Sequence, residues 1–310
     1  MQAMAWEEAK AILSYEVLRL VKRKAVAFMA AMAVLPVLGA LIAGFIASRE
    51  IGGERLWAVL MGFDIGTGAM TGLLAAVGVA GWAWLLGVVI GGDLFASDIR
   101  DGSLQLFMLR PARRVYPIAK IAAAGLFSIA FYTVASLIVL ISSIILGGWQ
   151  RDWWLAPLTG FILGVGLYPV ILTSSIFGIV TRSPIAGMIL GAAAYLLTGM
   201  AVSFGLSIIL IVGGIGNIEA WISFIEKEIL VSGAIPYLAG TNLPSIIYYA
   251  VTLGNSFTPI PLPAVGGSGQ VTITLELKPL DVLPLYTASL VTGTLALATI
   301  NLALLRRLEV

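Results

Sequence analysis

Cysteine and histidine are both missing from this chain of 310 residues. Without them there is no thiol for a disulfide and no imidazole, so the usual zinc and haem ligand sets and histidine-based catalytic triads are excluded. The P-loop pattern G-x-x-x-x-G-K-[ST] is missing as well, because the glycine-rich stretch GGSGQVT at 266–272 has no lysine. We therefore expect no catalytic residue, no metal ligand and no ATP hydrolysis in this chain, which is predicted not to be an enzyme.

Charged side chains are scarce. The chain has 18 Lys and Arg and 16 Asp and Glu, whereas 60% of its residues are apolar. A soluble domain of this size could not cover so much apolar surface with so few polar groups. The composition predicts an all-α integral membrane protein, and we expect one transmembrane domain over residues 1–310.

Long apolar runs mark the expected membrane spans. An ion at the centre of a bilayer costs about 2.5 to 3.5 kcal/mol, and a helix needs about 20 apolar residues to cross. Six runs predict six transmembrane helices, at 25–48, 65–92, 115–147, 155–181, 183–215 and 282–305. No charge lies at the middle of a span, and no inverted repeat is visible, so a secondary transporter is disfavoured.

Basic residues are unevenly divided between the two sets of connecting segments. Residues 1–24, 93–120, 182 and 306–310 carry 13 Lys or Arg and 7 Asp or Glu, whereas residues 49–64, 151–152 and 219–281 carry 5 and 9. Short loops rich in Lys and Arg stay on the cytoplasmic side of a membrane. We expect a multi-pass protein with both termini in the cytoplasm and residues 216–281 outside.

Residues 1–24 have the pattern of an amphipathic cytoplasmic helix. One helical stripe holds the apolar side chains Trp6, Ala9, Leu13, Val17 and Leu20, and the opposite side holds Glu7, Glu8, Arg19, Lys22 and Arg23. Such a helix would lie along the inner membrane surface. A plain anchor at the start of the first span, with VKRK as its charged end, is equally consistent.

A charged island, DIRDGSLQLFMLRPARRVYPIAK at 98–120, separates two apolar runs. Helical spacing places Phe95, Ile99, Leu106 and Leu109 on one face and Asp98, Asp101 and Gln105 beside it. We expect a short cytoplasmic helix over 94–109 that ends before Pro111, with Gly102 allowing a close approach. An ordinary interfacial loop with basic anchors fits the same residues.

The island resembles the cytoplasmic loop of ABC-2-type transporter permeases. In that family an acidic residue precedes Gly-Thr, an apolar run, Pro, a short gap, Arg and a Lys that opens the third helix. Gly102, Pro111 and Arg114 match this spacing, whereas Ser103 stands in the place of Thr and Lys120 lies about one residue early. Six spans, an amphipathic amino-terminal helix and a long outer segment before the last span are also similar to the family.

The resemblance implies a mechanism driven by a partner. The segment 93–114 would form the coupling helix that docks into a separate ATP-binding subunit, which would hold ATP and Mg. The residues implied in this coupling are Asp98, Asp101, Gly102, Arg110, Pro111, Arg113, Arg114 and Lys120. The family also implies a prokaryotic plasma membrane, export of a lipid-like or amphipathic substrate, and a homodimer or a dimer with a similar permease. Membrane lipid is the other expected partner, and nucleic acid is not expected.

The outer segment 216–281 is expected to be helical at first and irregular afterwards. NIEAWISFIEKEIL predicts an amphipathic helix at the outer surface. Beyond it, repeated prolines and GGSG argue against a seventh regular span and favour short re-entrant or surface pieces, followed by a strand-like VTITLEL. The family resemblance implies a cap over the outer mouth of the pathway, and a dimer or lipid contact is equally compatible.

A polar cluster in the fourth predicted span is a candidate for the pathway. Tyr168 and Pro169 are followed one turn later by Thr173 and Ser174. A proline kink with hydroxyls around it could line a translocation path. A packed kink, with the hydroxyls bonded back to the helix, explains the same residues.

Two classes of function remain open. One is the permease subunit of an ATP-driven transporter. The other is a membrane protein that does not transport, either a scaffold or an assembly factor, whose amphipathic segments bind partners or lipid. A neighbouring gene for a P-loop ATPase without membrane spans would favour the first.

Overall fold

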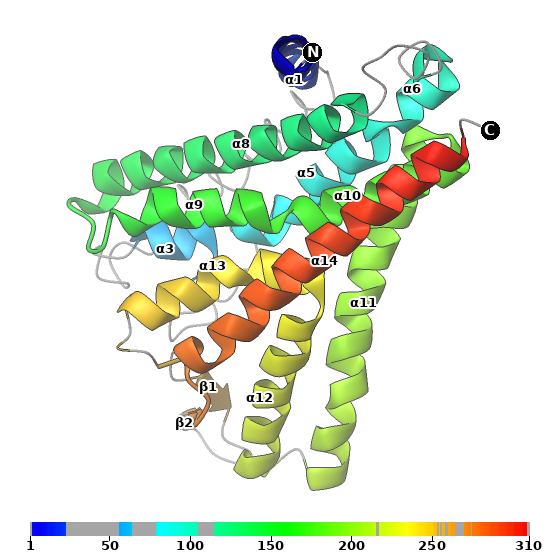
Figure 1. Cartoon of the computed structure of the whole chain (residues 1–310). Helices are drawn as coiled ribbons and strands as arrows, with labels where there is room; N and C mark the ends of the chain where they lie inside the picture. Colours follow the sequence, from blue (N-terminus) through cyan, green and yellow to red (C-terminus); the bar gives the residue numbers. More distant parts are fainter. Residues whose placement is uncertain are drawn as a thin grey trace.

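The fold is seen in a computed structural model (Figure 1). The structure describes residues 2–22, 56–63, 79–104, 115–214, 217–252, 254, 256–257, 260–263, 270–273 and 275–308. Helices dominate these residues, and one antiparallel pair of short strands completes them.

The described helices and strands have the following bounds in chain order. The helices are α1 Gln2–Val21, α3 Leu56–Met61, α5 Val79–Leu94, α6 Ala96–Arg100, α8 Val115–Gly147, α9 Leu155–Gly166, α10 Tyr168–Thr181, α11 Pro184–Gly213, α12 Ile218–Ala234, α13 Pro236–Thr252 and α14 Pro279–Arg307. The strands are β1 Ile260–Pro263 and β2 Gln270–Ile273.

Within the described residues, five helical segments are long and apolar enough to cross a bilayer. They are Val79–Arg100, Val115–Gly147, Leu155–Thr181, Pro184–Gly213 and Pro279–Arg307. These segments overlap five of the six predicted runs, although 65–78, the first part of the run 65–92, lies outside the described residues. The predicted span 25–48 also lies outside them, so the count of six stays a prediction.

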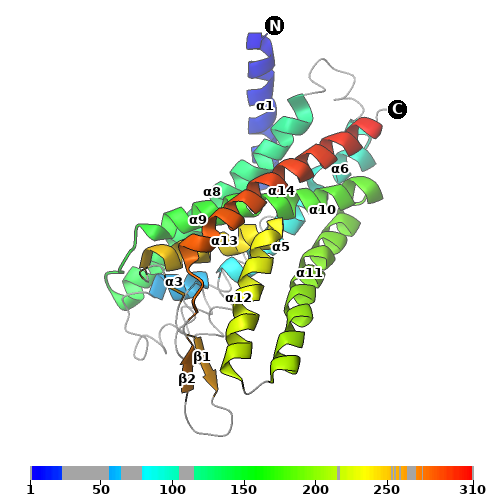
Figure 2. The same cartoon turned by 60° about the horizontal axis from the view of Figure 1, so that its bottom comes forward.

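Helix α10 occupies the centre of the bundle. It packs against α5, α11 and α14, while α9, joined to it at Leu167, packs along α8. Helices α8 and α9 form one group, and α11 and α12 form another (Figures 1 and 2). The two groups spread apart with increasing distance from α6, and α13 lies between them. The end of α14 lies at the same end of the molecule as α1 and α6.

Glycines bring the helix backbones close together. A Cβ atom at Gly91 would overlap the backbone of Ile171, and one at Gly164 would lie 2.8 Å from the amide nitrogen of Ile129. Small residues at four-residue spacing allow such contacts between membrane helices. Gly160, Gly187 and Gly191 lie at further close contacts of the same kind.

The outer segment differs from its prediction in one helix. A helix is present in the predicted place as α12, but α13 continues through Pro244, one of the prolines that we expected to interrupt regular helices. The chain instead turns at Ile235, where α12 and α13 meet at 117°, and together they are either a broken span or a re-entrant loop. The predicted strand VTITLEL is represented by β2, which pairs Val271 with Leu262.

Candidate functional site

The predicted coupling segment is interrupted within its described part. Helix α6 ends at Arg100, and Gly102 adopts a left-handed φ of 72°. A left-handed glycine is a common end of a helix because it turns the chain out of the helical path. The prediction of one continuous helix over 94–109 is therefore wrong, and 105–114, with Arg110, Pro111, Arg113 and Arg114, lies outside the described residues.

Asp98 is the centre of a buried polar network rather than part of an exposed face. Its side chain is 2% exposed. One carboxylate oxygen accepts hydrogen bonds from Lys120 Nζ and from the Tyr116 hydroxyl, and the other accepts one from Arg19 Nη1 at 3.0 Å. Asp98, which the resemblance implied in docking to an ATP-binding subunit, therefore does not lie on an exposed face.

Lys120 is as deeply buried as Asp98, with 2% of its side chain exposed. Its Nζ donates to the Tyr116 hydroxyl at 3.1 Å and lies 3.8 Å from Glu16 Oε2. The ammonium group also lies over the ring of Phe95, 5.6 Å from the centroid. Lys120 thus does not serve as an anchor at the membrane surface, because two carboxylates and two aromatic rings surround it.

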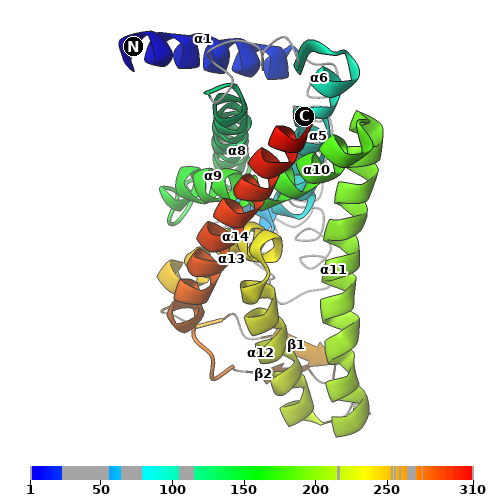
Figure 3. The ribbon, with the colours of Figure 1, turned by 45° about the vertical axis from the view of Figure 1, so that its right-hand side comes forward.

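Helix α1 supplies the remaining members of the network. Arg19 Nη1 lies 3.4 Å from Glu16 Oε1, and Nη2 donates to Ser97 Oγ at 3.3 Å. The predicted orientation of Arg19 toward water is wrong, since Glu16 and Arg19 face the bundle. Tyr15 and Leu18 are instead exposed. Figure 3 shows α1 lying across the molecule near α6 and the start of α8.

The charges of the network balance. Glu16 and Asp98 are acidic, and Arg19 and Lys120 are basic. Burial alone would lower the pKa of Arg19, but the charge of Asp98, its hydrogen bond and the charge of Glu16 outweigh burial and raise this pKa. Arg19 therefore remains a cation. We name the set Glu16, Arg19, Ser97, Asp98, Tyr116 and Lys120 the α1–α6–α8 network.

The spacing of these residues explains how three helices supply one site. Glu16 and Arg19 are three residues apart on α1, and Tyr116 and Lys120 are four apart on α8, so each pair shares a helical face. The network ties α6 to both other helices by charge-assisted bonds in a buried setting. Because each charge of the network is paired with an opposite charge inside the protein, the network holds the three helices in a fixed arrangement.

Asp101 and Gly102 form an exposed turn directly after α6. Asp101 pairs with Arg100 at 3.1 Å, and both side chains are more than half exposed. A Cβ at Gly102 would meet nothing within 4 Å. Of the predicted coupling residues in the described part of the chain, these two are accessible, whereas Asp98 and Lys120 are interior.

The predicted pathway residues lie in tight helix contacts. Tyr168 packs its hydroxyl against Gly125 of α8, and Ser174 lies against Gly191 of α11. Pro169 is buried in the first turn of α10. The hydroxyls of Thr173 and Ser174 are buried, and neither has a hydrogen-bond partner among the described residues. The expectation that these hydroxyls bond back to the helix is therefore wrong, although the tight contacts agree with a packed interruption of the span. A role in translocation stays a prediction.

A second buried polar contact was not anticipated from the sequence. Asn301 of α14 accepts a hydrogen bond from Ser175 at 2.8 Å and donates to the carbonyl of Leu172 at 3.0 Å. This contact joins α14 to α10. A single asparagine near the end of an apolar helix is the only signal for it in the sequence.

Comparisons with protein-family models, with curated proteins and with solved structures find no match. The fold and the composition together define a multi-pass membrane protein.

Proposed function

We propose that this chain is the membrane-spanning permease subunit of an ATP-driven transporter of the ABC-2 type, with a separate ATPase subunit as its source of energy. Its substrate would be lipid-like or amphipathic, because the bundle interior offers mostly apolar surface. ATP and Mg would bind in the partner, and export is the direction that the family resemblance suggests.

The observation that carries the proposal is the position of α6. This short helix interrupts the chain between α5 and α8 and is tied to α1 and α8 by the buried network. Because α6 also packs against α10 and α11, a force applied to its exposed turn would reach several spans at once. Coupling through a packed element requires this kind of rigid attachment.

Two ATP sites need two coupling elements, and one copy of this chain supplies one. The proposal therefore includes a two-fold assembly, either a homodimer or a pair with a similar permease. Both copies would present α6 and the basic end of α14 to the cytoplasm of a prokaryotic cell, in agreement with the distribution of Lys and Arg.

The test is co-purification with a P-loop ATPase without membrane spans that is encoded beside this chain, followed by ATP hydrolysis in liposomes. Asp101→Lys should reverse the charge of the docking surface, and Gly102→Trp should block it by bulk. We expect each to reduce ATPase recovery and lipid-stimulated hydrolysis about tenfold or more, as expected for the loss of a central interface contact.

Two controls separate docking from folding. Gly102→Asn tolerates the left-handed φ but adds little bulk, and Glu219→Lys reverses an exposed charge at the opposite end of the molecule. Both should copurify as the unaltered chain does. If Asp101→Lys and Gly102→Trp also bound and stimulated the ATPase normally, the exposed turn would not be a docking element, and a non-transporting scaffold would become the better proposal.

A further inference from the structure

The loop between α8 and α9 lies at a membrane boundary. Helix α8 ends at Gly147 and α9 begins at Leu155, and both belong to segments long enough to cross a bilayer. The loop that joins such helices must leave and re-enter the bilayer at its surface. We name residues 149–154 the tryptophan loop.

Buried hydrogen bonds hold the tryptophan loop in one shape. The Gln150 side chain is fully buried and donates to the carbonyls of Ser143 and Gly148 at 3.2 and 2.9 Å. The Gln150 side chain also accepts a bond from the backbone N–H of Trp57, whose indole N–H donates to the carbonyl of Arg151 at 3.0 Å. Trp57 of α3 therefore holds the loop by two hydrogen bonds.

The backbone of the loop also adopts special geometry. Asp152 has a φ of 55°, in the left-handed region that few residues other than glycine adopt. The preceding turn uses Gly148, with a φ of 79°. A loop held in such a conformation presents its outer side chains in a fixed arrangement.

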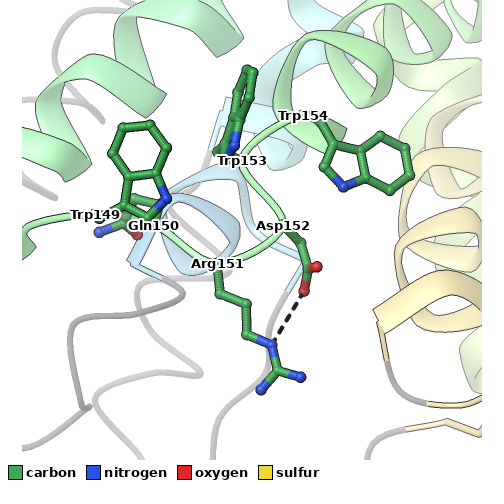
Figure 4. A pocket seen from close by; sticks show the side chains of 6 residues that line it. All are labelled: Trp149, Gln150, Arg151, Asp152, Trp153 and Trp154. Atoms are coloured by element: carbon green, nitrogen blue, oxygen red, sulfur yellow. Dashed lines mark ion pairs between the residues drawn. The ribbon is translucent and has the colours of Figure 1, made fainter.

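The outer side chains of the loop are aromatic and charged. Trp149, Trp153 and Trp154 are 73%, 46% and 48% exposed. Trp149 and Trp153 meet edge to face, with centroids 6.1 Å apart, beside a hollow of about 410 Å³. Figure 4 shows Arg151 pointing away from these rings, with Asp152 paired to its Nε at 3.8 Å.

We propose that the tryptophan loop is a phospholipid-binding site. The Arg151 guanidinium binds the lipid phosphate, and the rings of Trp149, Trp153 and Trp154 contact the glycerol and the upper acyl chains. Tryptophan is enriched at the membrane–water interface because its ring is apolar and its indole N–H is polar. A guanidinium offers two parallel N–H donors to a phosphate.

The charge of Asp152 favours a lipid over a free anion as the ligand of this site. Its carboxylate offsets the charge of Arg151, so the loop attracts small anions weakly. Binding must then gain its free energy from ring contacts as well, and inorganic phosphate cannot supply them. The proposal concerns lipid at the outer surface and is independent of transport or of an ATPase.

The test uses delipidated protein in a detergent without phosphate, titrated with phosphatidylglycerol and followed by native mass spectrometry. Arg151→Gln keeps the backbone carbonyl that Trp57 uses, and should weaken lipid binding about tenfold or more, the usual loss for a charged hydrogen bond. Trp149→Ala with Trp153→Ala should do the same. Lys278→Gln, at an exposed lysine before α14, and Trp82→Ala, at an exposed ring of α5, should bind as the unaltered chain does.

Three results would overturn the proposal. Unchanged lipid affinity in Arg151→Gln would remove the phosphate contact. Equal binding of diacylglycerol and phosphatidylglycerol would reduce the loop to an apolar anchor. Competition by millimolar inorganic phosphate would indicate an anion site in place of a lipid site. Circular dichroism and gel filtration of each variant show whether a loss of bound lipid is caused by unfolding of the protein.

Discussion

Asp98 and Lys120 illustrate how a membrane protein can retain charges in its interior. Each is bonded within the α1–α6–α8 network, so neither is left without an opposite charge. Replacing one member leaves the other buried and unpaired, which costs far more than a surface ion pair is worth. The two residues should therefore depend on each other for the stability of the fold.

We expect Asp98→Asn and Lys120→Met each to lower the free energy of unfolding by about 3 to 5 kcal/mol. The double variant should cost less than the sum of the two, by about 1 to 3 kcal/mol, because neither charge is then left alone. Unfolding in mixed micelles with increasing denaturing detergent measures these differences.

The exposed pair on the same short helix serves as the control. Arg100→Gln and Asp101→Asn should change the free energy of unfolding by about 0 to 1 kcal/mol. Additive effects of Asp98→Asn and Lys120→Met would contradict the network.

The contact between α9 and α13 depends on two facing glycines. A Cβ at Gly166 would overlap the backbone of Gly240, and a Cβ at Gly240 would overlap Gly166 in turn. This crossing fixes α13 against the bundle just after the 117° turn at Ile235. The orientation of the bent pair α12–α13 thus rests on a backbone contact that tolerates no side chain.

Gly240→Ala and Gly166→Ala should each lower the free energy of unfolding by about 1 to 3 kcal/mol, the usual cost of overpacking. Gly199→Ala and Gly205→Ala in α11 are matched controls, because a Cβ there meets nothing within 4 Å. These two should be neutral or stabilising by up to about 1 kcal/mol, since alanine favours a helix. Thermal unfolding of the four purified variants would compare them, and equal losses at all four sites would refute the contact.

The molecule as a whole has two chemically different ends. One end carries α1, α6 and the basic end of α14, whereas the tryptophan loop lies at the end of α8 that is far from α6 (Figure 1). The excess of Lys and Arg at the first end predicts that it faces the cytoplasm.

Single cysteines can test this orientation without background because the chain has none. A membrane-impermeant thiol reagent should label Asp101→Cys and Arg182→Cys from the cytoplasmic side of oriented vesicles. Arg151→Cys and Glu219→Cys should be labelled from the outside. Labelling of all four from one side would contradict the topology, and labelling in the reverse order would contradict the assignment of sides.

The sequence predicted the membrane class and five described spans because burial in lipid demands long apolar runs. It also predicted a helix where α12 lies and a strand at VTITLEL, 271–277, of which 271–273 belong to β2 whereas 275–277 are not in a strand. It failed at Pro244, where a buried proline sits inside α13 in spite of the missing N–H. Tertiary packing of α13 against α9 and α14 overrides the local preference.

The candidate site was predicted only in part. Lys120 and Asp98 were selected from a motif, but their pairing depends on α1, which is far away in the sequence. A charged residue on an amphipathic helix normally faces water, so Glu16 and Arg19 gave no sign that they face inward. Partners of this kind appear only when the helices are placed in space.

The order of the network along the chain has a consequence for biosynthesis. Every member, from Glu16 to Lys120, precedes α9. During translation the charges of α1, α6 and α8 can therefore pair with one another before α9 to α14 have been synthesised. The charged residues would then need no chaperone to bind them while the later helices insert. The later helices would pack against an amino-terminal half that has already folded.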